Sequence, residues 1–339
     1  MEEMIIRKEK FHDLVERALK EYTVVAPVDN EGVVLFRRIA TPSELTLEFS
    51  NTKIPAKSIL FQQTETLFTF SQRESVTIDV PEDSEKVLLL GIRPCDAQSL
   101  AVLDHVFAGE LEDPYVKKRE NTVLIGLSCL APEINCFCTS VGGSPFSAEY
   151  TDIQLTDIGE NYYIEAKTDK GKKVLDGMSD LFRLATEEDT EKKKELEKKA
   201  LDAMKRHMDT DDIVDRLENM FESSYWRKIA LKCLGCAACT YACPTCHCFD
   251  MLDESAVARG ARVRVWDSCM YPEYTRQASG YNPRPERMNR IRNRVYHKFN
   301  YYPKNWDIIA CVGCGRCISV CPVNIDIIDV INRTCEAEP

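Results

Sequence analysis

Two runs of cysteines in this chain share one spacing and one closing residue. The first is Cys233, Cys236, Cys239 and Cys243, followed by Pro244, and the second is Cys311, Cys314, Cys317 and Cys321, followed by Pro322. This is the spacing of bacterial [4Fe–4S] ligand runs, in which three thiolates from one tight loop reach three irons of a cube. Small residues inside each run let the backbone curl close to inorganic sulfide. The sequence therefore predicts two [4Fe–4S] clusters.

The fourth cysteine of each run is expected to serve the other cluster, because it points away from the loop that its own run forms. In this crossed scheme one cluster takes Cys233, Cys236, Cys239 and Cys321, and the other takes Cys311, Cys314, Cys317 and Cys243. Zinc is the competing interpretation, but zinc sites typically use two separated CxxC pairs. Clusters with four cysteine ligands have no open position, so we expect them to transfer electrons and not to act on a substrate.

Four more cysteines lie in the N-terminal half: Cys95, Cys129, Cys136 and Cys138. Cys95 comes shortly after the apolar run Val87–Ile92, and Cys129 shortly after the apolar run Thr122–Leu127. Helical spacing between these runs indicates parallel strands with a crossover, so both thiols are expected beyond the carboxyl ends of neighbouring strands. We therefore expect the four thiols to form a third [4Fe–4S] site. The alternative is inert buried cysteine, which behaves as a small hydrophobe.

Cys246, Cys248 and Cys269 admit two interpretations. Cys246 follows Cys243 closely enough to replace it as a ligand, or the three thiols supply part of an additional site with one N-terminal cysteine. We expect the side chain of His247 to point to solvent rather than to bind metal. Cys335, in the acidic C-terminal segment, is expected to be a free thiol.

Basic residues gather between the two runs. A cube with four thiolates is a net anion, and burying it without compensating charge is costly. We expect some of these residues to compensate the clusters or to dock a partner, and the alternative is an ordinary solvated basic helix. They are Arg284, Arg287, Arg290, Arg292, Arg294 and Lys298, with Glu286 as the acidic residue among them.

The rest of the chain must position these cysteines. Apolar spacing predicts a helix over Phe11–Tyr22 and short strands at Val24–Pro27 and Val33–Phe36, ahead of the two apolar runs. A charged stretch over residues 186–206 has little apolar face, which is typical of a solvated connector, and Ile213–Lys232 is expected to be helical.

The expected fold class is α+β, with an N-terminal α/β domain followed by a helical dicluster ferredoxin domain. The α/β domain spans residues 1–180 and carries the candidate third site. A charged helical connector spans 181–220. The ferredoxin domain spans 221–339, with helices separating the two runs.

Composition excludes several classes of protein. The net charge of −11 over 339 residues argues against nucleic acid as a partner. No stretch approaches the ~18–20 apolar residues of a membrane span, and the first residues lack the apolar run of a signal peptide. We therefore expect a cytoplasmic protein with no membrane contact, where 16 cysteines indicate metal or redox chemistry rather than disulfides. No strand–GxGxxG–helix pattern occurs, so we expect no flavin or nicotinamide site in this chain.

Five segments, taken in order, resemble a known family. The whole is similar to the iron–sulfur β subunit of soluble NAD(P)-linked [NiFe] hydrogenases (sulfhydrogenases) and to the iron–sulfur subunit of anaerobic sulfite reductase. The resemblance covers most of the chain from about residue 85 onward and gives counterparts to every cysteine discussed above except Cys335. The segments are GIRPCDAQSLAVLD, NCFCTS, CLGCAACTYACPTCHCFD, VWDSCMYPEYTRQASGYNPRPERMNRIRNRVYHK and CVGCGRCISVCP.

The resemblance implies a component of an anaerobic multi-subunit complex that relays electrons between a flavin-bearing, NAD(P)H-oxidising partner and a catalytic partner. That catalytic partner is a nickel–iron hydrogenase module or a sirohaem subunit, and the GIRPCDA stretch ranks hydrogenase first. A free-standing ferredoxin-like carrier or an iron–sulfur redox sensor is the alternative of another class. A carrier has no need of a large α/β domain, and a sensor typically carries a DNA-binding element, which is not visible here.

Overall fold

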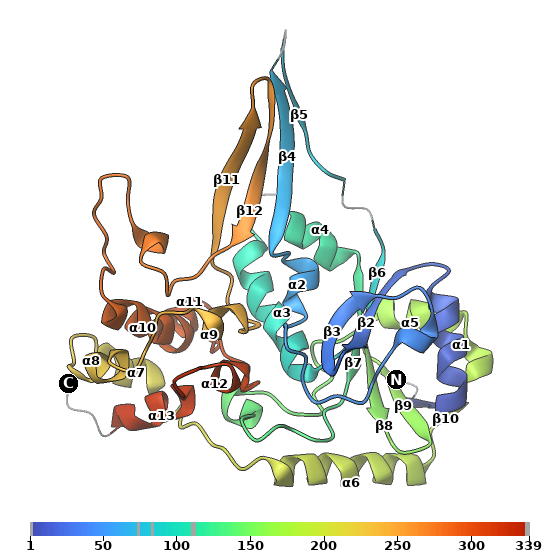
Figure 1. Ribbon diagram of the computed structural model, residues 1–339. Helices are drawn as coiled ribbons and strands as arrows, with labels where there is room; N and C mark the ends of the chain where they lie inside the picture. The colour runs from blue at the N-terminus through green and yellow to red at the C-terminus, as the bar shows by residue number, and fades with distance from the viewer. Residues whose placement is uncertain (1–2, 73–74, 83–84, 110–112, 336–339) are drawn as a thin grey trace.

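The computed structural model describes residues 3–72, 75–82, 85–109 and 113–335. An N-terminal region is built on an eight-stranded sheet, and a C-terminal helical region carries the two cysteine runs (Figure 1). A second, four-stranded sheet projects from the body as an arm. The first two and last four residues, which the expected domains 1–180 and 221–339 include, lie outside the described residues. In the described part of the chain, no helix is both long enough and apolar enough to cross a membrane.

The elements alternate between strands and helices in the first half and are mainly short helices in the second. The strands are β1 (Glu3–Arg7), β2 (Thr23–Asn30), β3 (Val33–Arg38), β4 (Thr64–Gln72), β5 (Val76–Asp79), β6 (Val87–Ile92), β7 (Thr122–Leu127), β8 (Ile153–Asp157), β9 (Asn161–Ala166), β10 (Arg183–Leu184), β11 (Phe249–Ala256) and β12 (Arg259–Trp266). The α-helices are α1 (Lys8–Ala18), α2 (Lys57–Leu60), α3 (Pro94–Phe107), α4 (Pro114–Glu120), α5 (Asp169–Asp176), α6 (Glu187–Ala203), α7 (Ile213–Glu218), α8 (Tyr225–Ala230), α9 (Ala238–Tyr241), α10 (Arg287–Tyr296), α11 (Tyr302–Trp306), α12 (Arg316–Ser319) and α13 (Ile327–Asn332).

The eight-stranded sheet has the order β10-β1-β9-β8-β7-β6-β2-β3. Its central strands β2, β6, β7 and β8 are parallel, and the outer pairings are antiparallel. The two apolar runs are β6 and β7, with the residue bounds that their composition predicts, and α3 and α4 form the crossover between them. Every residue of β7 is buried, as expected for a parallel strand covered on both faces. The predicted parallel pair is confirmed.

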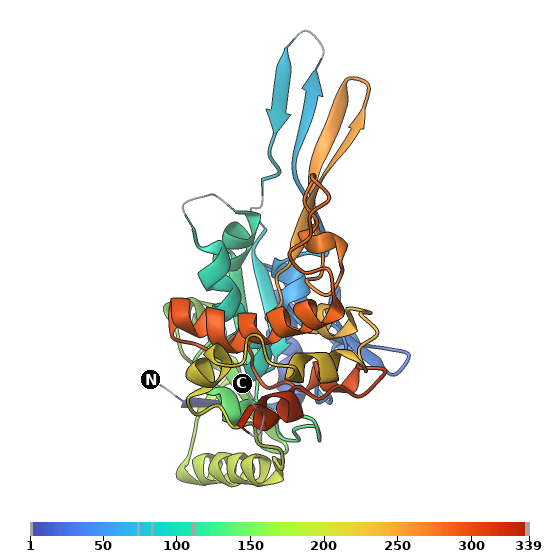
Figure 2. The ribbon, with the colours of Figure 1, turned by 90° about the vertical axis from the view of Figure 1, so that its left-hand side faces the viewer.

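The arm joins the two halves of the chain. Its strand order is β11-β12-β4-β5, so the C-terminal hairpin β11–β12 pairs through β12 with the N-terminal strand β4 (Figures 1 and 2). At the base of the arm the buried Arg264 guanidinium forms ion pairs with Glu65 and with Asp113. The sequence predicts only helices between the cysteine runs. In the structure, α10 and α11 do lie there, but the hairpin comes first.

The charged stretch and the following segment fold largely as helices. The stretch over 186–206 forms α6, which begins at a capping box between Thr186 and Asp189. The segment Ile213–Lys232, predicted as one helix, forms two short helices, α7 and α8. The prediction of a mixed fold, with a sheet-containing N-terminal region and a C-terminal dicluster region, is confirmed. The boundaries at 180 and 220 stay a prediction.

Candidate metal centres

Cysteines of both runs meet in one hollow of the C-terminal region, called here the first hollow. Its walls come from the loop before α9, from α10 and from the segment that leads into α13. The cysteines that line it are Cys233, Cys236, Cys239, Cys317 and Cys321. Cys321 of the second run thus lies beside the first three cysteines of the first run, as the crossed scheme requires. The ligation itself stays a prediction.

The backbone of the first run is turned by residues in the left-handed region. Gly235 has φ 73° and Ala237 has φ 62°, and only glycine adopts this region without steric cost. Cys236 lies between them and is exposed, whereas Cys233 and Cys239 are half-buried. Cys236 therefore marks the place where the first hollow reaches solvent.

Cys243 of the first run lies with the first three cysteines of the second run. Burial raises the pKa of Cys311, Cys314 and Cys317, and the nearby Cys243 sulfur acts in the same direction on all three. The buried Lys298 ammonium donates a hydrogen bond to Cys243 Sγ at 3.3 Å. These four cysteines, called the second group, therefore have a cation in direct contact.

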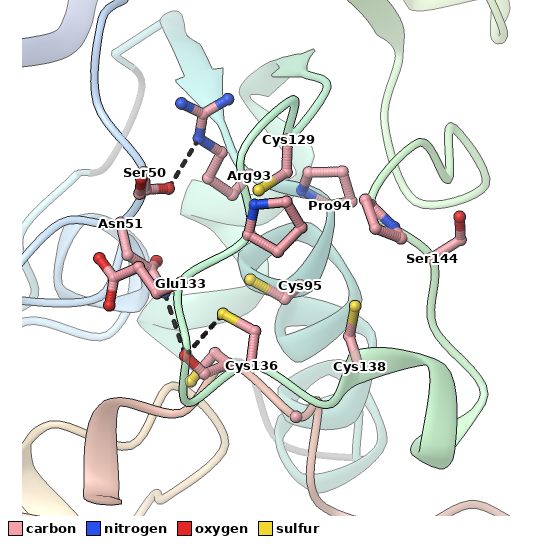
Figure 3. A pocket seen from close by; sticks show the side chains of 14 residues that line it. Ser50, Asn51, Arg93, Pro94, Cys95, Cys129, Glu133, Cys136, Cys138 and Ser144 are labelled. Atoms are coloured by element: carbon pink, nitrogen blue, oxygen red, sulfur yellow. Dashed lines mark hydrogen bonds between the residues drawn. The ribbon is translucent and has the colours of Figure 1, made fainter. Parts of the chain in front are cut away.

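The four N-terminal cysteines line one further hollow, called the third hollow (Figure 3). Cys95 lies in the first turn of α3, just beyond β6, and Cys129 lies just beyond β7. Since β6 and β7 are parallel neighbours, their carboxyl ends bring these two thiols to the same edge of the sheet. Cys136 and Cys138 come from the loop after β7. The expected convergence is observed, and the role of the four as ligands stays a prediction.

Crowding and burial make these thiols poor acids. Burial raises the pKa of Cys136 and of Cys138 to about 12 and also raises the pKa of Cys95 and Cys129. A bound metal cation replaces such protons and relieves the repulsion between neighbouring thiolates. The third hollow therefore suits a cationic cluster core better than it suits four free thiolates.

Arg93 places a positive charge beside the third hollow. It is 5% exposed, and its guanidinium donates to the carbonyl oxygens of Ser50 at 3.0 Å and Ser128 at 2.7 Å. These partners are neutral, so its charge remains available to the sulfurs of Cys95 and Cys129 nearby. A buried cation held by neutral carbonyl groups fits a site that binds an anionic cluster.

The loop of the second run packs directly against the third hollow. Phe137 N donates to Gly313 O at 2.8 Å, and a Cβ at Gly313 would lie 2.5 Å from the Cα of Cys138. Gly313 has φ 62°, and both it and Cys314 line the third hollow. The backbones therefore approach closely only because this residue is glycine. One loop thus belongs to the second group and also closes the third hollow.

The arrangement of the cysteines fits cubes better than single ions. Each thiolate of a [4Fe–4S] cluster contacts a different iron, so the sulfurs surround a hollow. A zinc ion instead needs four ligand atoms at ~2.0–2.3 Å from one centre. Among the described residues, no group of three or more His, Cys, Asp or Glu side chains is arranged to hold one metal ion. The two hollows therefore match the iron–sulfur interpretation.

The remaining cysteines lie in two places. Cys246, Cys248 and Cys269 gather near the base of the arm, while Cys335 is exposed and contacts Arg216. The prediction that His247 points to solvent is wrong. Its ring packs against His297 at 5.3 Å and Phe107 at 6.4 Å between centroids, and burial lowers its pKa to about 3.

The basic segment is not an ordinary solvated helix. Arg290, Arg292, Arg294 and Lys298 are each at most 9% exposed. Arg294 lines the first hollow, and the thiols of Cys239 and Cys317 raise its pKa although its burial opposes this. Arg292 instead stacks on the ring of Phe221 at 3.6 Å. The expectation of charge compensation therefore fits Arg294 and Lys298.

Sequence reasoning missed the ionic contacts that join the two halves. Arg316 donates from two nitrogens to the carboxylate of Asp96, at 2.6 and 2.7 Å, and both side chains are buried. Arg316 also donates to Thr52 O at 2.8 Å. A lone arginine inside the second run is the one local signal of this contact, and nothing in the sequence names its partner.

Comparisons with known proteins agree with this picture. A family model described as 4Fe-4S dicluster domain matches residues 232–325, which include both runs. Along almost its whole length the chain is similar to the sulfhydrogenase 2 subunit beta of Pyrococcus furiosus. The two are 33% identical over 333 residues, which cover 98% of each chain.

Proposed function

Because the chain belongs to the family of sulfhydrogenase beta subunits, we propose that it is the electron-transfer subunit of a cytoplasmic, multi-subunit oxidoreductase. In this proposal it relays electrons between a flavin- and NAD(P)H-binding subunit and a catalytic subunit of the [NiFe] hydrogenase type. It carries no catalytic residue of its own. The chemistry is the uptake and release of single electrons, which [4Fe–4S] clusters supply when bound.

The observation that carries the proposal is the position of the second group between the two hollows. Cys317 of this group also lines the first hollow, and Cys314 also lines the third hollow. Three cysteine-lined sites therefore follow one another without an intervening layer of other elements. A succession of adjacent redox sites is what a relay needs, whereas a protein that used one structural cluster would not need it.

The protein's own residues serve this role by holding charge in a dry environment. Lys298 contacts the second group, Arg294 lines the first hollow, and Arg93 lies beside the third. A cluster gains negative charge when it is reduced, so buried cations nearby favour the reduced form. Exposure of Cys236 gives one end of the succession access to solvent and to a partner.

The third site is tested by its metal content. Full-length protein reconstituted anaerobically should contain about four irons fewer when it carries Cys95→Ala, because a [4Fe–4S] cube has four irons. Cys335→Ser is the matched control and should keep all its iron, since Cys335 lies outside the three sites. If Cys95→Ala retains every iron and every electron paramagnetic resonance (EPR) signal, the third site is not a cluster.

The relay is tested with the flavin-bearing partner. The purified chain should be reduced by dithionite but not by NADPH, and addition of the flavin-bearing subunit from the same organism should make NADPH effective. Reduction by NADPH without that partner, or stoichiometric flavin released from the chain on denaturation, would contradict the proposal.

A further inference from the structure

Three cysteines that the proposed relay does not use are brought together by the base of the arm. In the β11–β12 hairpin Phe249 pairs with Trp266, and just beyond this pair Asp267 N donates to Cys248 O at 2.9 Å. Cys269 follows two residues later on the same strand exit. The register of the hairpin therefore places Cys248 against Cys269, although they are far apart in the sequence.

The three thiols converge on one point. The Cys248 and Cys269 side chains are hydrogen-bonded to each other, and Cys246 lies close to both Cys269 and Cys243. Cys269 is 7% exposed, and the other two are half-buried. Cys246 is the member of this trio that touches a cysteine of the second group. The trio is thus a separate set of sulfur donors beside the relay.

A buried cation from the other half of the chain faces these sulfurs. Lys57 of α2 is 2% exposed, its ammonium donates to Cys246 O, and it lies 4.2 Å from the centre of the Trp266 ring. In the part of the chain that the structure describes, no carboxylate forms an ion pair with Lys57. An ammonium buried in this way costs several kcal/mol unless an anion lies nearby.

The nearest candidates for that anion are the sulfurs themselves. Burial lowers the pKa of Lys57 to about 8, and the sulfurs of Cys246, Cys243 and Cys248 oppose this shift. Cys243 already has Lys298 as its contact. Lys57 therefore matches the negative charge of metal-bound thiolates at Cys246 and Cys248.

We propose that Cys246, Cys248 and Cys269 hold an additional iron–sulfur centre, with Lys57 as its buried counter-charge. Three cysteine ligands fit a cuboidal cluster in which one corner has no cysteine from this group. The proposal goes beyond the relay and does not depend on it, because it concerns sulfurs outside the three sites described above.

A simple dithiol pair explains less of the structure. It would account for Cys248 and Cys269, but it would leave Cys246 without a role and Lys57 without an anion. Replacement of Cys243 by Cys246 in the second group also fits less well, because Cys243 rather than Cys246 is the sulfur that acts on Cys311, Cys314 and Cys317.

The test is the iron and sulfide content of the full-length protein after anaerobic reconstitution with ferrous iron and sulfide. The triple variant Cys246→Ser, Cys248→Ser, Cys269→Ser should contain about three to four irons fewer than the wild type, the content of one cuboidal cluster. Its remaining EPR signals should be those of the relay sites. Cys335→Ser is the matched control and should lose no iron.

Native mass spectrometry of the wild type provides a second measurement if the triple variant does not fold. The intact mass should include one cluster more than the three relay sites account for. Lys57→Met should retain the fold and shift the added centre to a more negative potential. Equal iron in wild type and triple variant, zinc in place of iron, or a Cys248–Cys269 disulfide in the anaerobic protein would each overturn the proposal. Loss of the relay alone would appear instead as missing EPR signals from the other sites.

Discussion

Arg316 and Asp96 form a buried, two-point ion pair between the loop of the second cysteine run and the helix that follows β6. The two N–O distances are 2.6 and 2.7 Å, and the side chains are 5% and 1% exposed. The pair joins residues 220 positions apart, one next to Cys317 and the other next to Cys95. The second group and the third hollow are therefore fixed relative to each other.

Arg316→Met should destabilise the protein by about 3–5 kcal/mol, because it leaves the Asp96 carboxylate buried and unpaired. Thermal unfolding of the cluster-loaded protein under anaerobic conditions measures the effect. Arg262→Met is the control: its exposed pair with Asp253 should contribute about 0–1 kcal/mol. A double variant, Asp96→Leu with Arg316→Met, should be less destabilised than the single one. Equal stability of Arg316→Met and Arg262→Met would contradict the structural role.

Gly313→Ala should disturb two sites together. The added Cβ would meet the backbone of Cys138 at 2.5 Å, so the loop must move away from the third hollow. Gly142→Ala is a matched control with φ +76° and open space around it, and it should cost only about 1–2 kcal/mol from backbone strain. Iron content and EPR spectra of the two variants distinguish the cases. Normal clusters in Gly313→Ala would show that this close contact is dispensable.

Arg294→Met should lower the reduction potentials of the clusters nearest to it. Arg294 is a buried cation whose Nε has no hydrogen-bond partner among the described residues. Its removal should shift potentials by about 50–100 mV, since 59 mV corresponds to about 1.4 kcal/mol for one electron. Redox titration followed by EPR measures this shift. Arg294→Lys should restore most of it, and a potential unchanged in Arg294→Met would exclude an electrostatic role.

Cys321→Ser should perturb the cluster of Cys233, Cys236 and Cys239 more than the cluster of its own run. The reason is that Cys321 lines the first hollow with those three cysteines. Mössbauer or EPR spectra of the variant identify which cluster has changed. A cluster that each run forms completely and unaided would be the opposite result, and would end the crossed scheme.

Local signals account for the parts of the fold that were predicted. The strands β6 and β7 are continuous apolar runs, and the helical spacing between them indicated the crossover that places Cys95 and Cys129 at one edge. The spacing of the two runs predicted which cysteines meet in the first hollow.

The missed features depend on contacts distant in sequence. The pairing of β12 with β4 joins two strands whose residues alternate and are partly exposed, which resembles an isolated hairpin in the sequence. His247 is buried because aromatic rings from α3 and the segment after α10 happen to meet there. Likewise, Arg316 finds Asp96 only after both halves have folded.

The close fit of Gly313 against Cys138 also bears on the order in which the protein can be assembled. Translation proceeds from the N-terminus, so residues 95–138 leave the ribosome long before the loop at 311–316 is made. The wall that this loop contributes to the third hollow is therefore missing until nearly the whole chain has been synthesised. Completion of that site is thus an event of the released polypeptide, and a prematurely terminated chain leaves its N-terminal thiols open to the cytosol.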